Sequence, residues 1–331
     1  MTGLVLIERL SRGVLILDGG TGTFLRAKGL PAGHPPCLWS AQRPEEVRQL
    51  QEAYVEAGAD IVLTNTFGAS RLHLEPHGWG HRVLDLNRAA VHLARTAAHG
   101  KALVAGDIGP CGPVAGTFRR LSRSEAISIF AEQIEALASA GVDLLAIETI
   151  SDLEEMEVAV SAARLVALDL PIMASLSFTR EGKLRSGEGP AAAARALEAM
   201  GVQVAGANCS FGFQSLLWIC EEMTAATSLP VAMKPSAGIP PAPPLSADEV
   251  AEYARRFVEA GANLVGGCCG VDPSMLRSIA RAVKGMPPIR RAPVAPSSAN
   301  DCWVVCLFGK RLSQADRPAA SNTPSNNTEL R

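Results

Sequence analysis

Cysteines are the residues whose positions suggest chemistry in this 331-residue chain, which contains eight of them. Cys209 and the adjacent pair Cys268 and Cys269 each end a short apolar run that reads as a buried strand. If those strands belong to one parallel sheet that closes into a barrel, their ends lie at the same opening and the three thiols converge there. Three thiolates at about 2.3 Å from an ion with a vacant fourth position are typical of catalytic zinc. The alternatives are buried structural cysteines or a disulfide within the adjacent pair.

The charge of such a site restricts its chemistry. Three thiolates carry −3 against the +2 of zinc, so the site keeps a net charge of −1 before any substrate binds. That excess makes the metal a poor polariser of carbonyl groups and a good carrier of a substrate thiolate. Coordination depresses the pKa of a thiol from about 8.5, so the bound sulfur loses its proton and stays nucleophilic. The predicted reaction is attack of a bound thiolate on an electrophile, with alkyl transfer the natural choice.

Polar residues that could bind the rest of a substrate follow several other apolar runs. Asp18 and Glu148 could flank an ammonium group, while backbone N–H groups of the turn after Asp18 could bind a carboxylate. The alternatives are that Asp18 caps a turn and Glu148 is an acid at a helix N-terminus. Asp107 is interpreted as a structural residue. The candidate substrate-binding residues are Asp18, Gly19, Gly20, Thr21, Gly22, Thr23, Thr64, Asn65, Thr66, Glu148 and Asn208.

The elements that must position these residues follow from hydrophobic periodicity. Short runs rich in Val, Ile and Leu alternate with longer segments of helical period, and no run ends in a hairpin turn. The predicted strands are Val14–Gly20, Asp60–Phe67, Ala102–Pro110, Asp143–Thr149, Ile172–Phe178, Gln203–Cys209, Pro230–Gly238 and Asn263–Cys269. The predicted helices are Pro44–Ala57, Arg82–Ala98, Arg123–Ala140, Asp152–Ala167, Pro190–Met200, Ser215–Ala226, Ala247–Ala260 and Pro273–Val283.

The ends of these helices carry residues that are typical of helix caps. Several begin after a residue that can accept hydrogen bonds from the first turn, namely Ser122, Asp152, Ser246 and Asp272. Three end at a glycine suited to a left-handed cap, namely Gly58, Gly141 and Gly261. Eight strand–helix units with near-continuous apolar strands predict an α/β fold, a single-domain (β/α)₈ TIM barrel, because helices must cover the strands. A doubly wound parallel sheet is the alternative.

Composition excludes several classes of protein. Hydrophobic residues make up 47% of the chain and charged residues 19%, which is ample for a large core and excludes a disordered chain. The formal net charge of −2 provides no strong field for nucleic acid or an anionic membrane. The chain shows no signal peptide and no apolar stretch of membrane-spanning length, so we expect a cytoplasmic protein with reduced thiols.

The composition changes near residue 290. Residues 290–331 are rich in Pro, Ser, Asn and Ala and have no regular period, so the barrel is predicted to span residues 1–289 and the remainder to be a poorly ordered tail. Cys302 and Cys306 lie in that tail and are interpreted as part of an unstructured appendage. Cys37, Cys111 and Cys220 have no partners at ligand spacing.

Five segments together resemble a known family, the homocysteine-binding, zinc-dependent S-methyltransferases, and within it the homocysteine domain of cobalamin-dependent methionine synthase. They are Leu17–Thr23, Gly58–Ala69, Gly106–Pro110, Asn208–Ser210 and Gly266–Gly270, and the resemblance runs from Val14 to about Val283. It implies a (β/α)₈ barrel, one zinc ion on Cys209, Cys268 and Cys269, and homocysteine as the methyl acceptor. Similar roles for Asp18, Glu148 and the Gly19–Thr23 amides are implied as well.

The methyl donor is left open by the same comparison. The resemblance implies a methylcorrinoid donor, and because the chain has no room for folate and cobalamin modules, a separate corrinoid protein would have to dock at the barrel mouth. The alternatives are S-methylmethionine or a betaine-like onium donor, which the segment Leu38–Ser40 favours, and a noncatalytic zinc- or thiol-binding barrel. Ser236 departs from the family pattern, which more often has Asn there.

Overall fold

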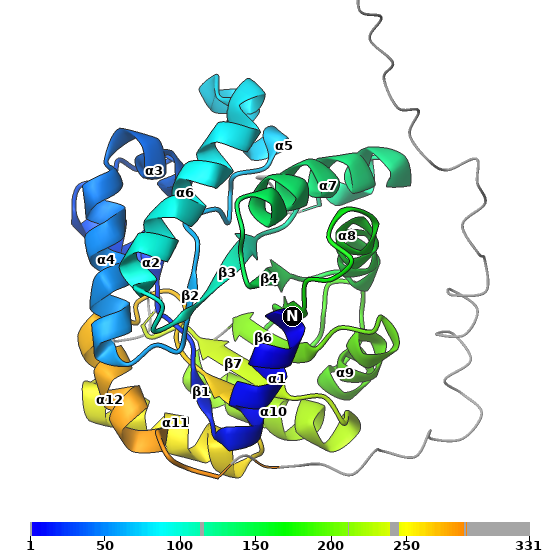
Figure 1. Ribbon diagram of the computed structural model, residues 1–331. Helices are drawn as coiled ribbons and strands as arrows, with labels where there is room; N and C mark the ends of the chain where they lie inside the picture. Colours follow the sequence, from blue (N-terminus) through cyan, green and yellow to red (C-terminus); the bar gives the residue numbers. More distant parts are fainter. Residues whose placement is uncertain (1, 113–115, 211, 239–244, 288, 290–331) are drawn as a thin grey trace, which may run out of the picture. The chain divides into compact units, whose positions relative to one another are not determined.

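Strands and helices alternate through the part of the chain that the computed structural model describes, residues 2–112, 116–210, 212–238, 245–287 and 289 (Figure 1). The strands are β1 (Leu15–Ile16), β2 (Ile61–Leu63), β3 (Leu103–Ile108), β4 (Leu144–Ile150), β5 (Ile172–Leu176), β6 (Val204–Cys209), β7 (Val231–Pro235) and β8 (Leu264–Val265). The α-helices are α1 (Thr2–Arg12), α2 (Thr21–Ala27), α3 (Trp39–Gln42), α4 (Pro44–Ala57), α5 (Arg71–Leu74), α6 (Val83–Ala98), α7 (Arg123–Ser139), α8 (Leu153–Val166), α9 (Pro190–Ala199), α10 (Phe213–Ala226), α11 (Ala247–Glu259) and α12 (Pro273–Val283).

The strands form one parallel sheet that curls into a barrel. Their order is β1-β8-β7-β6-β5-β4-β3-β2, so chain neighbours are also sheet neighbours and β8 pairs with β1. A parallel bridge between Leu17 and Ile61 joins the first strand to the second. The amide of Asp60 adds a hydrogen bond of 2.7 Å to the carbonyl of Ile16 across the same gap. The predicted (β/α)₈ barrel is therefore confirmed.

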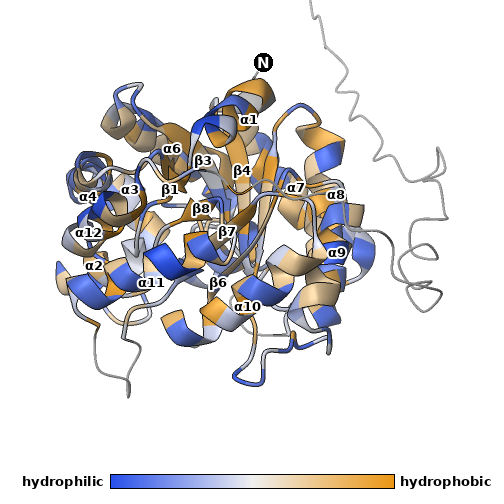
Figure 2. Ribbon diagram, turned by 90° about the horizontal axis from the view of Figure 1, so that it is seen from below, coloured by the Kyte–Doolittle hydropathy of each residue, from blue (hydrophilic) through white to orange (hydrophobic). Residues whose placement is uncertain are grey.

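Both faces of the strands are buried, which explains why the strand sequences are continuously apolar. Leu15 and Leu17 belong to the cluster inside the barrel, whereas Ile16 between them packs with the surrounding helices. On β3 the same alternation places Leu103 and Ala105 inside. Figure 2 shows mostly apolar strands in the interior and helices around them that carry both polar and apolar residues.

Helix α1 was not predicted from the sequence. It lies across the barrel in Figure 1, and its Leu6 and Leu10 pack into the interior cluster. The Arg9 guanidinium contacts the carbonyls of Asp60 and Lys101, which precede β2 and β3. Because α1 covers the end where the strands begin, the opposite end, at the carboxyl termini of the strands, is the one left for a site.

The predicted helix-capping residues are present in the structure. Gly58, Gly141 and Gly261 have φ of 111°, 88° and 103°, in the left-handed region that favours glycine. Ser122 and Ser246 each form a capping box with the glutamate three residues later. The side chains of Asp152 and Asp272 accept hydrogen bonds from the first turns of α8 and α12.

The strands next to the site are shorter than predicted. β1 ends at Ile16 and β8 at Val265, so Asp18 and Cys268 lie in the loops beyond them. Glycine makes this close passage of loops possible, since a Cβ at Gly266 would lie 2.6 Å from the carbonyl oxygen of Leu17. Besides α1, the sequence analysis also missed α2 and the two short helices α3 and α5.

Two further expectations concern the limits of the fold. The predicted tail, residues 290–331 with Cys302 and Cys306, lies outside the described residues. Within the described residues, no helix combines the length and the apolar character that crossing a bilayer requires.

Candidate functional site

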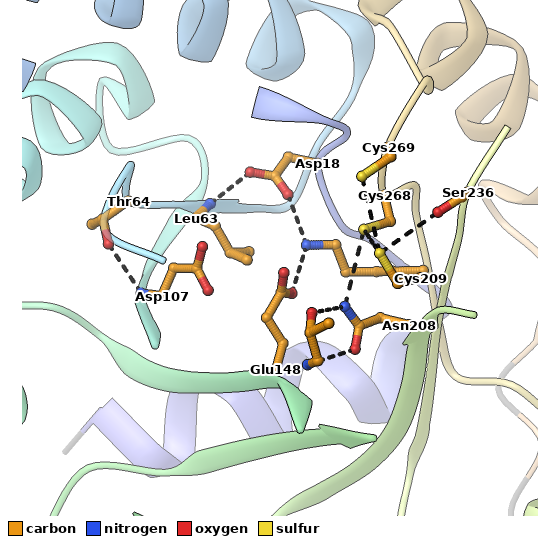
Figure 3. Close-up of polar contacts among 12 residues, drawn as sticks. Asp18, Leu63, Thr64, Asp107, Glu148, Asn208, Cys209, Ser236, Cys268 and Cys269 are labelled. Carbon is orange, nitrogen blue, oxygen red and sulfur yellow. Dashed lines mark hydrogen bonds and ion pairs between the residues drawn. The ribbon is translucent and has the colours of Figure 1, made fainter. Parts of the chain in front are cut away.

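The three cysteines singled out in the sequence meet at the carboxyl-terminal end of the barrel (Figure 3). Cys209 is the last residue of β6, and Cys268 and Cys269 lie in the loop after β8. The Sγ of Cys209 lies 3.1 Å from that of Cys268 and 3.9 Å from that of Cys269, and all three sulfurs lie within 4.8 Å of one another. A tetrahedral ion with bonds of about 2.3 Å would separate its sulfur ligands by about 3.8 Å. The cluster therefore has the donor set and spacing to hold a metal ion.

Unusual backbone geometry brings these sulfurs together. Cys209 and Ser210 have φ of 55° and 49°, a left-handed conformation that is uncommon outside glycine. In the β8 loop, Gly270 has φ of 81°, and a Cβ there would lie 2.0 Å from the carbonyl oxygen of Ala237. Strain of this kind costs about 1–3 kcal/mol per residue and is concentrated at functional sites in proteins.

Asn208 ties the cysteine cluster to the end of β4. Its side-chain oxygen accepts from the amide of Thr149 at 2.9 Å, and its Nδ2 donates to the Thr149 hydroxyl at 2.7 Å. Thr149 is itself held at φ 63°, which is rare for a β-branched residue. Asn208 Nδ2 also lies 4.0 Å from Cys268 Sγ. Asn208, predicted as a substrate-orienting residue, thus fixes the surroundings of the sulfurs.

The three thiols differ in acidity. Hydrogen bonds from Cys209 and Cys268 lower the pKa of Cys269 to about 3. The same contacts raise the pKa of Cys209, which is the donor. Ser236 Oγ lies 3.7 Å from Cys209 Sγ and adds a further donor on the β7 side.

A cluster of charged side chains fills the centre of the same end of the barrel. Lys234 on β7 places its Nζ 3.0 Å from Glu148 Oε2 and 3.4 Å from Asp18 Oδ1. The other oxygen of Asp18 accepts from the amide of Leu63 at 2.7 Å. All three charged residues are buried. Lys234 thus occupies the space between Asp18 and Glu148, and binding of a substrate ammonium by this pair stays a prediction.

The pKa values of these three residues depend on burial and on ion pairing, which act in opposite directions. Burial raises the pKa of Asp18, and the nearby Lys234 partly offsets it. The pKa of Glu148 is raised for the same reason and with the same opposing partner. Burial alone would lower the pKa of Lys234, but Glu148 and Asp18 raise it well above its usual value, so it stays charged.

Asp107, at the end of β3, is the third carboxyl group of the cluster. Burial raises its pKa well above the usual value, with Glu148 adding to the rise. Its amide donates to Thr64 Oγ1 at 3.0 Å, and Thr66 Oγ1 donates to its carbonyl at 2.7 Å. The hydroxyls predicted to orient a substrate thus hold the backbone of Asp107. Asn65, between them, donates to the Pro36 carbonyl and to Ser40 Oγ.

The glycine-rich turn after β1 lies beside the cysteine loop. The Gly20 amide donates to the carbonyl of Val271 at 2.9 Å, and Thr23 Oγ1 accepts from the amide of Gly270 at 3.1 Å. A Cβ at Gly19 would lie 2.4 Å from the same Val271 oxygen, so only glycine fits there. The predicted anion site therefore has one amide engaged within the protein, and the first turn of α2 supplies the others.

Two adjoining cavities connect these groups. One, of about 530 Å³, is lined by the cysteine cluster, by all four charged residues, by Gly19–Gly22, and by Thr64 and Asn65. The other, of about 490 Å³, lies on the β4–β5 side. They share the lining residues Phe67, His73, Thr149 and Cys209. Cys209 therefore faces two compartments.

Sequence reasoning missed two of the charged residues. Lys234 lies in the predicted strand Pro230–Gly238 and was given no role, and Asp107 was interpreted as structural. A signal was present for Lys234, because a lysine inside the apolar run Val231–Pro235 must be buried, and buried lysines need carboxylate partners. Cys37, Cys111 and Cys220 lie outside the cysteine cluster, as expected, and all three are buried.

Comparison with known proteins identifies the family. The sequence profile of homocysteine S-methyltransferases matches residues 15–283, most of the chain. The chain belongs to the homocysteine S-methyltransferase family. The resemblance expected from the sequence motifs is thereby confirmed. The family match spans every strand of the barrel and every residue of both clusters.

Curated relatives in the family are longer proteins. Methionine synthase of Mycobacterium tuberculosis is 30% identical over 319 residues, which cover 89% of this chain and 27% of that protein. Methionine synthase of Mycobacterium leprae is 30% identical over 301 residues, covering 84% of this chain and 25% of that protein. The chain thus spans about a quarter of the length of these relatives.

Solved structures of a family member agree with the fold. The homocysteine methyltransferase MmuM from Escherichia coli, in its metallated form, matches with a TM-score of 0.71 and 25% identity, covering 84% of this chain and 99% of that one. Its apo form matches with a TM-score of 0.68. The carboxyl transferase domain of Rhizobium etli pyruvate carboxylase, at 15% identity and a TM-score of 0.52, shares the fold alone.

Proposed function

We propose that this protein transfers a methyl group to the thiolate of homocysteine, giving methionine, with one zinc ion held by Cys209, Cys268 and Cys269. The observation that carries the proposal is the convergence of these three sulfurs within 4.8 Å, at the edge of a cavity whose centre is acidic. The family match and the metallated form of the E. coli relative support it. Thiolates in such a site must stay reduced, so we place the enzyme in the cytoplasm.

The chain's own residues prepare the site for a thiol acceptor. Zinc, when bound, lowers the pKa of a coordinated thiol and so supplies a sulfur nucleophile at neutral pH. The strained backbone at Cys209 and the Asn208–Thr149 pair fix where the ligands stand. Because the supporting groups are buried and already hydrogen-bonded, little reorganisation is needed when the acceptor sulfur arrives.

The amino-acid end of the acceptor would bind on the far side of the same cavity. The acidic cluster containing Asp18 and Glu148 attracts an ammonium group, and the amides in Gly19–Thr23 receive the carboxylate at the start of α2. Thr64, Asn65 and Thr66 stabilise this side of the cavity through hydrogen bonds to the backbone of Asp107 and Pro36. Asn208 supports the sulfur end, so the two ends of the substrate contact separately built surfaces.

The second cavity is suited to the methyl donor, because Cys209 and Thr149 line both cavities and a donor methyl there would face the acceptor sulfur. We propose a methylcorrinoid donor carried by a separate protein, on the similarity to methionine synthases. A freestanding enzyme that uses S-methylmethionine or a betaine-like onium donor is the alternative. The similarity to MmuM supports this alternative. MmuM is a homocysteine methyltransferase, and the match covers 99% of its chain, which corresponds to the barrel that we assign to residues 1–289.

A donor screen tests this proposal. Zinc-loaded protein would be incubated with L-homocysteine and, separately, methylcobalamin, S-methylmethionine, glycine betaine or methyltetrahydrofolate, and methionine would be measured. One donor should give turnover, and Cys268→Ala should lose metal and turnover together. The matched control is Cys220→Ala, which removes a buried thiol outside the cluster and should keep both. Turnover by zinc-free Cys268→Ala protein would contradict the mechanism, and zinc binding without turnover on any donor would favour a noncatalytic barrel.

A further inference from the structure

The cysteine loop, residues 267–271 after β8, carries two of the three proposed metal ligands, Cys268 and Cys269. Backbone hydrogen bonds hold the side of the loop that faces β7. The Cys268 amide donates to the carbonyl of Pro235, and the Cys269 carbonyl accepts from the amide of Ala237, both at 2.8 Å. The far end of the loop needs a separate anchor if the two sulfurs are to keep their positions.

Tyr54, on helix α4, anchors that far end. Its hydroxyl donates to the carbonyl of Val271 at 2.9 Å, although the two residues lie 217 positions apart in the sequence. The same carbonyl accepts from the amide of Gly20 at 2.9 Å. The Val271 amide donates to the carbonyl of Cys268 at 3.1 Å and so closes a tight turn that contains Cys269. A displacement of Val271 would therefore move both ligand residues.

Packing alone does not explain the hydroxyl group of Tyr54. The ring belongs to the main core cluster on the buried face of α4, and the residue is 1% exposed. Phenylalanine would fill the same space without bringing into the core a polar group that is costly unless it is hydrogen-bonded. The Val271 carbonyl already accepts from Gly20, so it does not need a second donor. The hydrogen bond from Tyr54 therefore serves to fix the position of the loop.

The ring of Tyr54 also contacts the glycine-rich turn after β1. A Cβ at Gly19 would lie 2.7 Å from Cε1 of Tyr54 and 2.8 Å from its hydroxyl oxygen, so the turn lies directly on the ring. The turn is joined to the start of the cysteine loop as well, because the amide of Gly267 donates to the carbonyl of Asp18 at 2.9 Å. One side chain of α4 thus holds the cysteine loop and the turn against each other.

We propose that Tyr54 is a positioning residue for the metal site, whose hydroxyl holds the cysteine loop in the conformation in which Cys268 and Cys269 meet Cys209. It acts through the backbone of Val271 and supplies no ligand itself. This inference rests on the proposed function, because it takes the three cysteines as the metal ligands.

The test compares Tyr54→Phe, which removes only the hydroxyl group, with Tyr253→Phe. Tyr253 is the other tyrosine of the chain and lies half-buried on α11, so it is a matched control. The zinc affinity of the full chain would be measured by competition with a chromophoric chelator. Tyr54→Phe should bind zinc about tenfold more weakly than the natural protein, as is typical when a group that orients metal ligands is removed. Tyr253→Phe should stay within about twofold of it.

A second measurement on the metal-free chain separates positioning from a general loss of stability. Relaxation dispersion of the amide NMR signals reports exchange between conformations on the microsecond-to-millisecond timescale. In Tyr54→Phe the amides of Gly267–Val271 should show such exchange, because the loop no longer has one conformation. Addition of zinc should suppress it. The natural protein and Tyr253→Phe should show no exchange in the loop, and in all three proteins the amides of β4 and β5 should be unaffected.

Three results would overturn the inference. They are a zinc affinity of Tyr54→Phe within about twofold of the natural value, an equal loss of affinity in the two variants, and loop signals in Tyr54→Phe that behave as in the natural protein. If the natural protein binds no zinc, the proposed function fails. The NMR comparison, which needs no metal, still decides whether Tyr54 holds the loop.

Discussion

The cysteine cluster and the acidic cluster share one cavity but are built in opposite ways. Among the cysteines, Cys209 stands on strained backbone in a left-handed conformation, and the three sulfurs contact mainly one another. The acidic residues stand on or just beyond regular strands, and Lys234 extends between two of them from a third side of the barrel. The cysteine cluster has sulfur ligands that can bind a metal ion, whereas the acidic cluster already contains the positive charge of Lys234. A site can therefore be preorganised by backbone strain on one side and by a buried ion pair on the other.

Removing the lysine should have the largest effect on stability. Lys234→Met leaves Asp18 and Glu148 buried without a cation, so we expect the free energy of unfolding at pH 7 to fall by about 3–5 kcal/mol. Urea denaturation measures this, with Lys284→Met, an exposed lysine, as a control that should change it by less than about 0.5 kcal/mol. The loss should shrink in acid as the carboxyl groups become protonated. A loss below about 1 kcal/mol would mean that Lys234 is not essential to the acidic cluster.

Weakening the cysteine side should cost less. Asn208→Ala removes two hydrogen bonds that hold Thr149 at positive φ, and we expect a loss of about 2 kcal/mol. Adding Thr149→Gly should recover part of that loss, because glycine adopts this conformation without strain. Urea denaturation of both single variants and of the double variant gives the coupling. Strict additivity would show that the two residues do not act as one unit.

The smallest effect is expected to be a gain. The pKa of Asp107 is raised on folding, so its contribution to stability is fully present below about pH 4 and is lost as pH rises through the folded pKa. The groups that face it are Glu148, Lys234, Asp18 and Cys268. Asp107→Asn should therefore be more stable than the natural protein at pH 7, by about 1 kcal/mol, and nearly equal to it at pH 4. Lower stability of the variant at pH 7 would indicate that the carboxyl group supports the fold.

Much of the fold could be predicted because its signals are local. The eight strands, the capping residues Ser122 and Ser246 and the glycines that end three helices follow from short stretches of sequence. Helix α1 was missed, since its apolar residues are explained only by the barrel end that they cover. The short length of β1 and β8 was missed for a similar reason, because the loops after them pass each other through glycines.

The position of the candidate site could be predicted from the sequence, but the contacts of many of its side chains could not. A residue at a strand end must lie at the barrel mouth, so Cys209, Cys268 and Cys269 could be placed together from sequence. What a side chain contacts depends on its reach and on residues far away in the chain. Thr64 and Thr66 therefore bond to Asp107, and Lys234 occupies the acidic pair, although no local pattern specifies either contact.

X-ray absorption at the zinc edge tests the central claim most directly, because it reports the atoms bound to the metal. The protein would be loaded with one equivalent of zinc and measured before and after addition of L-homocysteine. We predict three sulfur ligands at about 2.3 Å in the loaded protein and four after homocysteine binds. A first shell of nitrogen and oxygen alone, or a sulfur count that homocysteine does not change, would contradict the account.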